Sequence, residues 1–510
     1  MGTDEALTIP GALARARRDH PSTEAVVDGH TRLTYADLGA AVDRAARAFR
    51  SHGVGRGDPV AIWAPNGLPW ILAALGALSA GAVLVPLNTR YKGEEAHWIL
   101  ARSRARFLFV ENAFLGQDYL GMLGARGTEP GVPGLPDLRS VVTFDAAPVP
   151  GALPWTGFLA SGDHDPRPVP APGPDDLSDV LFTSGTTGRP KGVMCTHAQN
   201  VRTFDAWCER TGLEHGDRYL VINPFFHCFG YKAGIVACLL RGATMVLQPV
   251  FRAEETLHLV EAERITVLPG PPTIYTTLLD TPGLAERDVS TLRLAVTGAA
   301  SVPVRLVERV RTELGMHVVT AYGLTESCGT VTVCSLGDGD TTVATTSGRP
   351  IEGVDVRISD AGEVLVRGHN VMRGYLGEEA ATAETVVDGW LHTGDLGRLD
   401  GNGYLTITGR LKEMFTVGGF NVYPAEVEQV LTRHPDVSEA AVVGVPDPRM
   451  GEVGRAYVTA RPGTDPDRDA LVAHCRERLA NFKVPREVVV LDALPRNAAG
   501  KVRKVDLPTG

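Results

Sequence analysis

Residues 182–192 read Phe-Thr-Ser-Gly-Thr-Thr-Gly-Arg-Pro-Lys-Gly and lie between two strand-like stretches, at 179–182 and 193–195. The glycines and hydroxyl side chains of such a loop can turn backbone N–H groups and oxygens toward phosphate, while Lys191 adds a positive charge. The GxxxxGK[ST] spacing is absent, and strands on both sides differ from the strand-loop-helix setting of that motif. The run therefore predicts a phosphate-binding loop that is not a Walker A loop.

Length, charge and hydropathy set the broad class. At 510 residues the chain exceeds what one core normally holds, so two or more domains are expected. A net charge of −10 without a basic block argues against nucleic acid or an anionic membrane as the main partner. The longest apolar run, 71–87, is interrupted by Gly76 and Pro86, which is typical of a buried helix followed by a strand. We expect no membrane insertion.

The cysteines indicate a reducing environment. There are 7, scattered and without CxxC spacing, which favours free thiols and gives no zinc pattern. The acidic start at residues 1–4 shows no secretory signal. Together these features predict a cytoplasmic location.

Helical and strand-like patterns alternate along most of the chain. Thr34-Tyr-Ala-Asp37 is a capping box that opens a helical pattern, and a buried strand is expected at 59–63. A helical stretch at 69–79 then precedes a strand at 82–86. Because the alternation recurs over several hundred residues, it predicts an α/β fold with largely parallel sheets.

Two breaks suggest how the chain is divided. Residues 124–175 are rich in proline and glycine, and we expect an extended surface connection there. A second break at 409–412 precedes about 100 residues with the pattern of a small α+β unit. We therefore predict a large domain over 1–409 and a small one over 410–510. The small unit is expected to have helices from 424 and over 468–479 and strands at 440–445, 455–460 and 487–491.

Several motifs after predicted strands could bind a nucleotide. In Tyr322-Gly-Leu-Thr-Glu-Ser327 the aromatic ring can cover adenine, Thr325 can reach a phosphate and Glu326 can hold Mg²⁺, although a structural turn is the alternative. Thr297-Gly-Ala-Ala-Ser301 has small residues that let a ligand lie against the backbone. Asp395, on a glycine-flanked turn, can accept two ribose hydroxyls or cap the turn.

Two further features are ambiguous when taken alone. Asn223–Ala233 places three phenylalanines around His227, which suits either a pocket wall with one polar group or a core histidine. Lys501 follows Leu494-Pro-Arg-Asn-Ala-Ala-Gly near the end of the chain, where most lysines are simply solvated. Arg410 lies shortly after Asp395 and could serve ribose or phosphate.

The order of these motifs along the chain resembles that of the adenylate-forming superfamily, which includes acyl- and aryl-CoA synthetases, luciferases and peptide-synthetase adenylation domains. The resemblance covers nearly the whole chain. It implies a large multi-sheet α/β N-terminal domain, a small mobile α+β C-terminal domain and a ligand site between them. It also implies ATP, Mg²⁺ and coenzyme A as cofactors and a carboxylic acid, as a small molecule, as the substrate.

The resemblance implies a role for each motif residue. Residues 183–191 cradle the pyrophosphate end of ATP, Lys501 bridges the reacting carboxylate and the α-phosphate, and Lys412 is the hinge. Glu326 binds the metal. The catalytic set is Lys501, Thr183, Lys191, His227 and Glu326. The cofactor-binding set is Thr183, Ser184, Gly185, Thr186, Thr187, Gly188, Lys191, Gly298, Ala299, Ala300, Tyr322, Gly323, Thr325, Asp395, Arg410, Gly418, Gly419, Phe420 and Lys501. The acid-binding set is His227, Cys228, Phe229, Gly230, Ala233, Ala321 and Gly329.

A narrower resemblance concerns the acid. The stretches 222–235, 267–275 and 494–502 are similar to actinobacterial CoA ligases that act on an indanedione-propanoate from steroid breakdown. This favours a bulky polycyclic alicyclic acid over a straight fatty acid, and a diterpenoid-acid ligase would look much the same. The implied pocket residues are mostly small, which leaves room for a ring system.

We therefore expect an AMP-forming acyl-CoA synthetase that makes acyl-AMP and pyrophosphate and then transfers the acyl group to coenzyme A. One alternative enzyme passes the acyl group to a carrier-protein thiol, and a light-emitting oxygenase would need the same adenylate. The alternative from another class is a nucleotide-binding protein without catalysis. A homodimer is left open.

Overall fold

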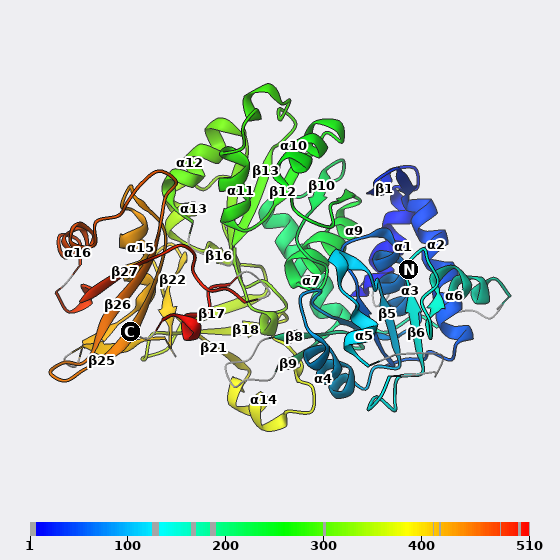
Figure 1. The fold of residues 1–510 in the computed structure, drawn as a ribbon. Coiled ribbons are helices and arrows are strands. Elements are labelled where there is room, and N and C mark those ends of the chain that lie inside the picture. Colours follow the sequence, from blue (N-terminus) through cyan, green and yellow to red (C-terminus); the bar gives the residue numbers. More distant parts are fainter. Residues whose placement is uncertain are drawn as a thin grey trace.

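A computed structural model describes residues 7–124, 132–164, 170–183, 190–298, 302–411, 413–417, 420–479, 481–497 and 501–508. Most of the chain forms two large sheets with helices between and outside them, and a smaller unit at the carboxyl end stands to one side (Figure 1). The α/β fold with a small C-terminal α+β unit is confirmed.

The first large sheet contains the strands on either side of the predicted phosphate loop. Six of its strands, β7, β6, β5, β3, β4 and β8, run parallel to one another. Strands β9 and β19 continue the sheet beyond β8 as antiparallel strands. Within the described residues the order is β19 (Gly374–Tyr375), β9 (Lys191–Thr196), β8 (Leu177–Thr183), β4 (Val83–Pro86), β3 (Pro59–Trp63), β5 (Phe107–Val110), β6 (Ser140–Thr143) and β7 (Leu153–Pro154).

In the second large sheet the central strands β1, β11, β10, β12, β13 and β14 run parallel to one another. Antiparallel strands lie at both edges, β2 at one and β15 and β16 at the other. Parallel strands present their carboxyl ends at one edge, where ligands bind in open α/β sheets. Its described order is β16 (Arg349–Pro350), β15 (Thr332–Val333), β14 (His317–Tyr322), β13 (Leu294–Gly298), β12 (Val267–Pro269), β10 (Arg218–Val221), β11 (Thr244–Leu247), β1 (Glu24–Asp28) and β2 (Thr31–Thr34).

A layer of helices separates the two sheets and shares one core with both. Val60 and Ile62 of β3 face this layer, whereas Ala61 and Trp63 face a second core on the outer side, as strand alternation requires. The inner helices are α1 (Ile9–Asp19), α2 (Tyr35–Ser51), α3 (Leu68–Ser79), α7 (His197–Thr211) and α9 (Ala237–Arg241). The outer helices are α4 (Gly93–Ser103) and α5 (Tyr119–Met122) on the first sheet and α10 (Ala253–Ala262), α11 (Pro272–Leu279) and α12 (Val304–Glu313) on the second.

Local sequence explains why these helices begin and pack where they do. The capping box predicted at Thr34 and Asp37 is present, with both reciprocal hydrogen bonds, at the start of α2. Helix α3 is apolar on all sides and nearly every residue after Pro69 is buried, as expected for a helix enclosed between two sheets.

The prediction of an extended connection over 124–175 is wrong for part of that segment. It contains β6, β7 and helix α6 (Trp155–Ser161). Phe158 of α6 is fully buried and packs its ring against Phe49 and Phe109, about 5 Å between ring centres. The surrounding prolines and glycines hid these short elements, whose stability comes from tertiary packing.

A third, smaller sheet follows the second one along the chain. Within the described residues it contains β17 (Val354–Ile358), β18 (Glu363–Gly368), β21 (Trp390–Leu399), β20 (Val386–Val387) and, paired with β21, β22 (Leu405–Arg410). The short helix α13 (Asp340–Thr345) precedes it in sequence, and α14 (Glu379–Thr385) lies between β18 and β20. Strand β22 ends at Arg410, one residue beyond the predicted end of the large domain.

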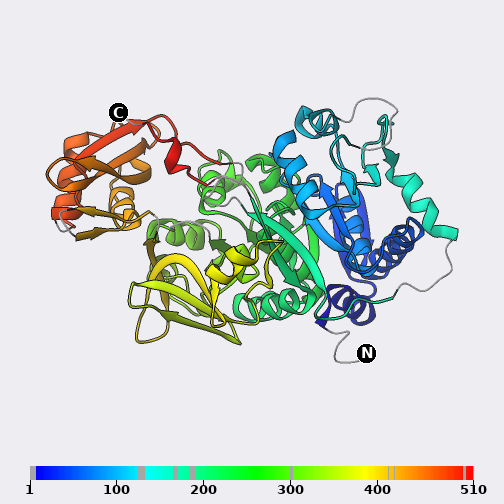
Figure 2. The same ribbon diagram turned by 90° about the horizontal axis from the view of Figure 1, so that it is seen from below.

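The carboxyl-terminal unit has its own core, separate from the others (Figure 2). Its strands in the described residues are β24 (Phe420–Val422), β23 (Phe415–Val417), β26 (Gly451–Ala460), β25 (Val437–Asp447) and β27 (Glu487–Leu491). Helices α15 (Pro424–Thr432) and α16 (Arg468–Arg476) pack on the sheet, and α16 ends three residues earlier than the sequence predicted.

No helix in the described residues combines the length and apolar character needed to cross a membrane. No three His, Cys, Asp or Glu side chains in the described part of the chain are grouped to hold a metal. All seven cysteines lie in described segments, and each is a free, buried thiol.

Candidate active site

The predicted phosphate loop joins two antiparallel strands. Thr183, the last residue of β8, pairs with Lys191, the first residue of β9, so the loop starts and ends at the same edge of the sheet. The Lys191 ammonium lies 5.0 Å from the ring centre of Tyr375. The Tyr375 hydroxyl donates to Glu326 Oε1 at 2.9 Å. Tyr375 therefore links the loop to the predicted metal ligand.

The motifs that follow β13 and β14 share one edge of the second sheet. A Cβ on Gly323 would overlap the backbone of Gly329 and Thr330, so glycine lets the turn after Tyr322 fold back closely. A Cβ on Gly298 would approach the carbonyl oxygen of Ala321 at 2.5 Å. Gly298 thus lets the ends of β13 and β14 lie close together, and Gly323 lets the turn after β14 fold back on itself.

Tyr322, Asp395 and Arg410 form a connected group. Asp395 on β21 and Arg410 on β22 are direct partners in the sheet, and Arg410 Nε lies 2.9 Å from Asp395 Oδ1. The Tyr322 hydroxyl donates to Asp395 Oδ2 at 2.7 Å. Burial, reinforced by the Asp395 carboxylate, raises the pKa of Tyr322 well above its usual value, so it stays a donor. Three predicted nucleotide-binding residues thus meet through one carboxylate.

Lys501 lies close to this group although it comes from the carboxyl-terminal unit. Burial lowers the pKa of its ammonium, and repulsion from Arg410 adds to the effect, whereas Glu413 and Asp395 act in the opposite sense. The side chain is nevertheless reachable by solvent.

The segment that carries Lys501 is fixed by a turn and an ion-paired lysine. Lys501 and Asn497 exchange two hydrogen bonds, from Lys501 N to Asn497 Oδ1 at 2.9 Å and from Asn497 N to the Lys501 carbonyl at 2.8 Å. Three residues on, Lys504 Nζ lies 2.7 Å from both Glu413 Oε2 and Glu428 Oε1. These contacts tie the last described residues to the start of the unit and to α15.

The predicted acid-binding residues surround a short turn after β10. His227 caps a helix of three residues, Cys228–Gly230, and its Nδ1 accepts from Phe229 N at 3.2 Å. His227 is exposed as a residue, while desolvation of the imidazole by the protein atoms around it lowers its pKa, which favours the neutral form. The core-histidine alternative does not fit this exposure.

The remaining residues of this set lie around the same turn. Cys228, Gly230 and Ala233 are buried, Phe229 is half-buried, and a Cβ on Gly329 would lie 2.9 Å from Cys228 Cβ. Ala321, at the end of β14, is half-buried.

Part of the predicted site falls outside the described residues. This applies to Ser184, Gly185, Thr186, Thr187, Gly188, Ala299, Ala300, Lys412, Gly418 and Gly419. For Phe420 only the backbone is described, as the first residue of β24. The roles of these residues stay predictions.

Sequence reasoning missed several side chains that contact the predicted ones. Tyr375 is a single aromatic residue after Gly374, and its position beside Glu326 depends on a contact across 49 residues. Lys232 lies within the predicted acid-binding stretch, where a lysine in an apolar run was a visible signal that went unused. Asp179, Glu413 and Lys504 carry no local pattern that distinguishes them from surface charges.

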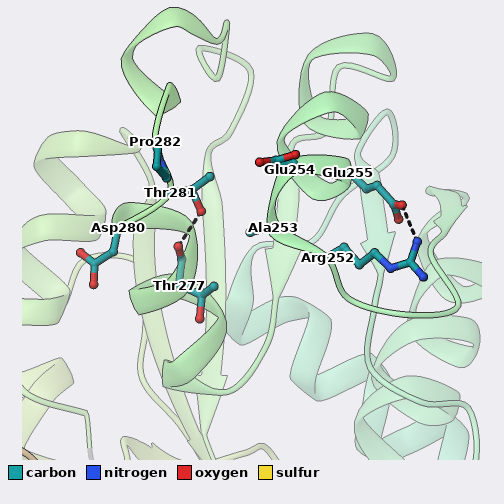
Figure 3. Close-up of a pocket in the computed structure, with 8 residues that line it drawn as sticks. All are labelled: Arg252, Ala253, Glu254, Glu255, Thr277, Asp280, Thr281 and Pro282. Carbon is teal, nitrogen blue, oxygen red and sulfur yellow. Dashed lines mark hydrogen bonds and ion pairs between the residues drawn. The ribbon is translucent and has the colours of Figure 1, made fainter. Parts of the chain in front are cut away.

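A surface hollow of about 530 Å³ lies elsewhere, between the start of α10 and the end of α11 (Figure 3). It is open and lined by charged and hydroxyl side chains, including Glu254, Asp280 and Thr281. None of the predicted site residues lines it, so it does not bear on the chemistry described above.

Known proteins match this chain over nearly its whole length. Residues 13–376 match the family model described as AMP-binding enzyme, and residues 426–501 match that of the AMP-binding enzyme C-terminal domain. Two relatives are 52% identical over 98% of this chain and 98% of their own length; both are described as 3-[(3aS,4S,7aS)-7a-methyl-1,5-dioxo-octahydro-1H-inden-4-yl]propanoyl:CoA ligase, from Rhodococcus jostii and Mycobacterium tuberculosis. A solved Mycobacterium tuberculosis fatty acyl CoA synthetase is 31% identical, with a TM-score of 0.77 over 99% of this chain and 98% of its own.

Proposed function

The chain belongs to the AMP-binding enzyme family, and from this premise we propose that it is an ATP-dependent acyl-CoA ligase acting on a bulky alicyclic acid. The observation that carries the proposal is the convergence of Tyr322, Asp395 and Arg410 with Lys501, because it brings a candidate cation of the small domain to the nucleotide-binding group of the large one. The resemblance noted in the sequence and the matched family agree with this assignment.

In the first half-reaction the acid's carboxylate attacks the α-phosphorus of ATP, and pyrophosphate leaves. Two anions must meet, so the protein has to cancel charge and hold them in line. Positioning can supply about 7–11 kcal/mol, and each aimed donor about 3 kcal/mol more. Lys191 and Lys501 are the cations proposed for this work. Asp395, with Arg410, is proposed to accept the ribose hydroxyls.

The residues around Glu326 fit a magnesium ion that arrives with ATP. Magnesium takes oxygen ligands and is bound through one or two carboxylates plus substrate phosphates, so a dedicated cluster of protein ligands is not needed. Glu326 would hold the ion, and when bound the ion would neutralise phosphate charge. Tyr375 donates to Glu326 Oε1, and among the described residues no side-chain hydrogen bond or ion pair engages the other oxygen.

In the second half-reaction the coenzyme A thiol attacks the acyl carbon and releases AMP. Lys501 and the segment at 418–420 lie on one small domain and cannot both occupy one site. We therefore infer a rotation about Lys412 between the two steps, a domain movement of the gating kind. The proposed division at 409/410 lies between the two segments that match the family models.

The proposed acid carries a fused ring system with a short carboxylate side chain, as in the substrate named for the two relatives that are 52% identical. Small side chains on the proposed wall, such as Ala233, Ala321 and Gly329, leave room for rings. Free thiols and the use of ATP and coenzyme A favour a cytoplasmic enzyme.

The deciding experiment incubates the protein with MgATP, coenzyme A and a panel of acids, with mass-spectrometric detection of products. The panel contains an indanedione-propanoate, a diterpenoid acid, a linear fatty acid and an aryl acid. We expect a thioester from the ring-system acids and AMP in equal amount. Acyl-AMP without thioester would instead indicate a carrier-protein thiol, and ATP binding without pyrophosphate release would contradict catalysis.

A further inference from the structure

Four buried polar side chains form a closed ring, which we call the Lys232 ring. Lys232 and Asp179 are both completely buried, with Nζ and Oδ1 3.1 Å apart. Lys232 also donates to Cys328 Sγ at 3.5 Å. Cys328 donates to Asn200 Oδ1 at 3.0 Å, and Asn200 Nδ2 donates to Asp179 Oδ2 at 2.6 Å. Each member therefore fixes the next.

The ring joins the three segments assigned to the reactants. Asp179 lies on β8, four residues before Thr183 at the start of the phosphate loop. Cys328 directly follows the short helix Thr325–Ser327, which carries Glu326. Lys232 belongs to a π-helical stretch, Tyr231–Val236, that continues from the acid-binding turn. The Lys232 ammonium, on the acid side of the proposed site, thus contacts one residue of the ATP side and one of the metal side.

A completely buried ion pair such as Lys232–Asp179 is a poor way to stabilise a fold, because both charges lose their hydration. Burial disfavours the charged ammonium, yet the Asp179 carboxylate and the neighbouring thiols of Cys195, Cys328 and Cys228 together outweigh this and raise the pKa of Lys232, which favours the charged ammonium. Apolar residues of similar size would often stabilise a core equally well or better. A π-helical turn is also rare and occurs mostly at functional sites. Both observations favour a geometric role over a purely stabilising one.

We propose that Lys232 is a positioning residue for acyl-adenylate formation, and this rests on the proposed function. By holding β8, the Glu326 turn and the acid-binding turn in one arrangement, it sets the carboxylate in line with the α-phosphate. Lys232 itself touches no reactant in this role. Misplacement of a reactant by about 1 Å can cost on the order of 10²-fold in rate, so a modest shift of one segment would be measurable.

The test separates positioning from stability with paired substitutions. Lys232→Met alone leaves Asp179 as an uncompensated buried charge and should lower the melting temperature sharply. The double variant Lys232→Met/Asp179→Asn removes both charges and should regain most of the melting temperature. We expect its kcat for pyrophosphate release to stay about 10²-fold below wild type at saturating ATP and acid, with MgATP binding about 10-fold weaker.

Recovery of both melting temperature and kcat in the double variant would overturn the proposal. If that variant does not fold, Lys232→Met/Asp179→Leu provides a second, apolar replacement judged by the same criteria. The matched control is Arg106→Met/Asp58→Asn, an ion pair of the same sheet whose residues directly precede β5 and β3, at the amino-terminal ends of these strands. For this variant kcat should stay within threefold of wild type.

The two proposals fail in different ways. A wild-type protein that releases no pyrophosphate with any acid would contradict the proposed function. In that case MgATP affinity alone, measured by titration calorimetry, tests the positioning role of the Lys232 ring. Binding about 10-fold weaker in the folded double variant would support the positioning role, and unchanged binding would overturn it.

Discussion

Among single side chains, Lys501 carries the most specific expectation. Replacing it with alanine removes a cation near Asp395 and Arg410, so adenylate formation should fall by roughly 10²–10³-fold. Thioester formation from supplied acyl-AMP should be largely spared, because the proposed rotation moves Lys501 away from the reacting groups in that step. Pyrophosphate release and thioester formation, measured separately, test this. Equal loss in both would contradict it, and Arg503→Ala, an exposed pair with Asp506, is the control.

The same lysine gives a pH dependence with a definite sign. Burial and the neighbouring Arg410 lower the pKa of Lys501 below 10.5, so the cation is present at low pH and lost as pH rises through the lowered value. The adenylation rate should therefore fall at alkaline pH before a free lysine would titrate. The supplied-adenylate reaction serves as the control, since its rate should not show this step.

The contacts of individual residues mark the limit of sequence reasoning. Tyr322, Asp395 and Arg410 were predicted from separate motifs, and the structure joins them through one carboxylate. Lys232 and Cys328 lie 96 residues apart, and their contact depends on how two layers pack. No local pattern encodes such a distance, so the ring that they share could not be predicted.

At the scale of secondary structure, the acid-binding turn leaves no room for a side chain at Gly230. A Cβ on Gly230 would overlap the carbonyl oxygens of Asn223 and Pro224. We expect Gly230→Ala to displace the turn, lower stability by about 1–3 kcal/mol and raise the KM for the acid. Gly234→Ala is the matched control, because its Cβ would make an ordinary 3.4 Å contact with Val221. Thermal melts and acid titrations of both variants decide it; similar behaviour would contradict the expectation.

The carboxyl-terminal tail depends on an ion pair rather than on a regular element. Lys504→Met removes the contacts to Glu413 and Glu428, which are partly exposed, so global stability should fall by at most about 1–2 kcal/mol. Adenylate formation should fall about 10-fold, because the segment that carries Lys501 loses its anchor. Hydrogen exchange over 501–508 and pyrophosphate release test this together. Unchanged exchange would contradict the anchoring role.

Elements with a strong local signal were predicted well. The capping box of α2 and the bounds of β27 agree with the structure, since hydrogen-bonding side chains and apolar runs are local properties. Strand β6 and helix α6 were missed because they are short and lie among prolines and glycines, and because burial against Phe49 and Phe109 stabilises them. Packing partners distant in sequence decided these cases.

For the protein as a whole, the proposed rotation about Lys412 can be followed directly. All seven native cysteines are buried, so Val387→Cys on β20 and Arg468→Cys on α16 would be the reactive thiols of a doubly labelled protein. Energy transfer between the labels should change when coenzyme A is added to protein holding a stable acyl-AMP mimic. Constant transfer under these conditions would argue against domain alternation. Addition of coenzyme A without the mimic is the control.

The burial of every thiol also affects whether the protein can undergo thiol–disulfide exchange. An enzyme proposed to bind coenzyme A meets its disulfide whenever the cell becomes oxidising, and an accessible cysteine would exchange with that disulfide. Exchange requires attack by a thiolate that can reach the incoming sulfur, which no cysteine of this chain presents at its surface. No surface thiol of the folded protein is therefore expected to form a mixed disulfide with the cofactor.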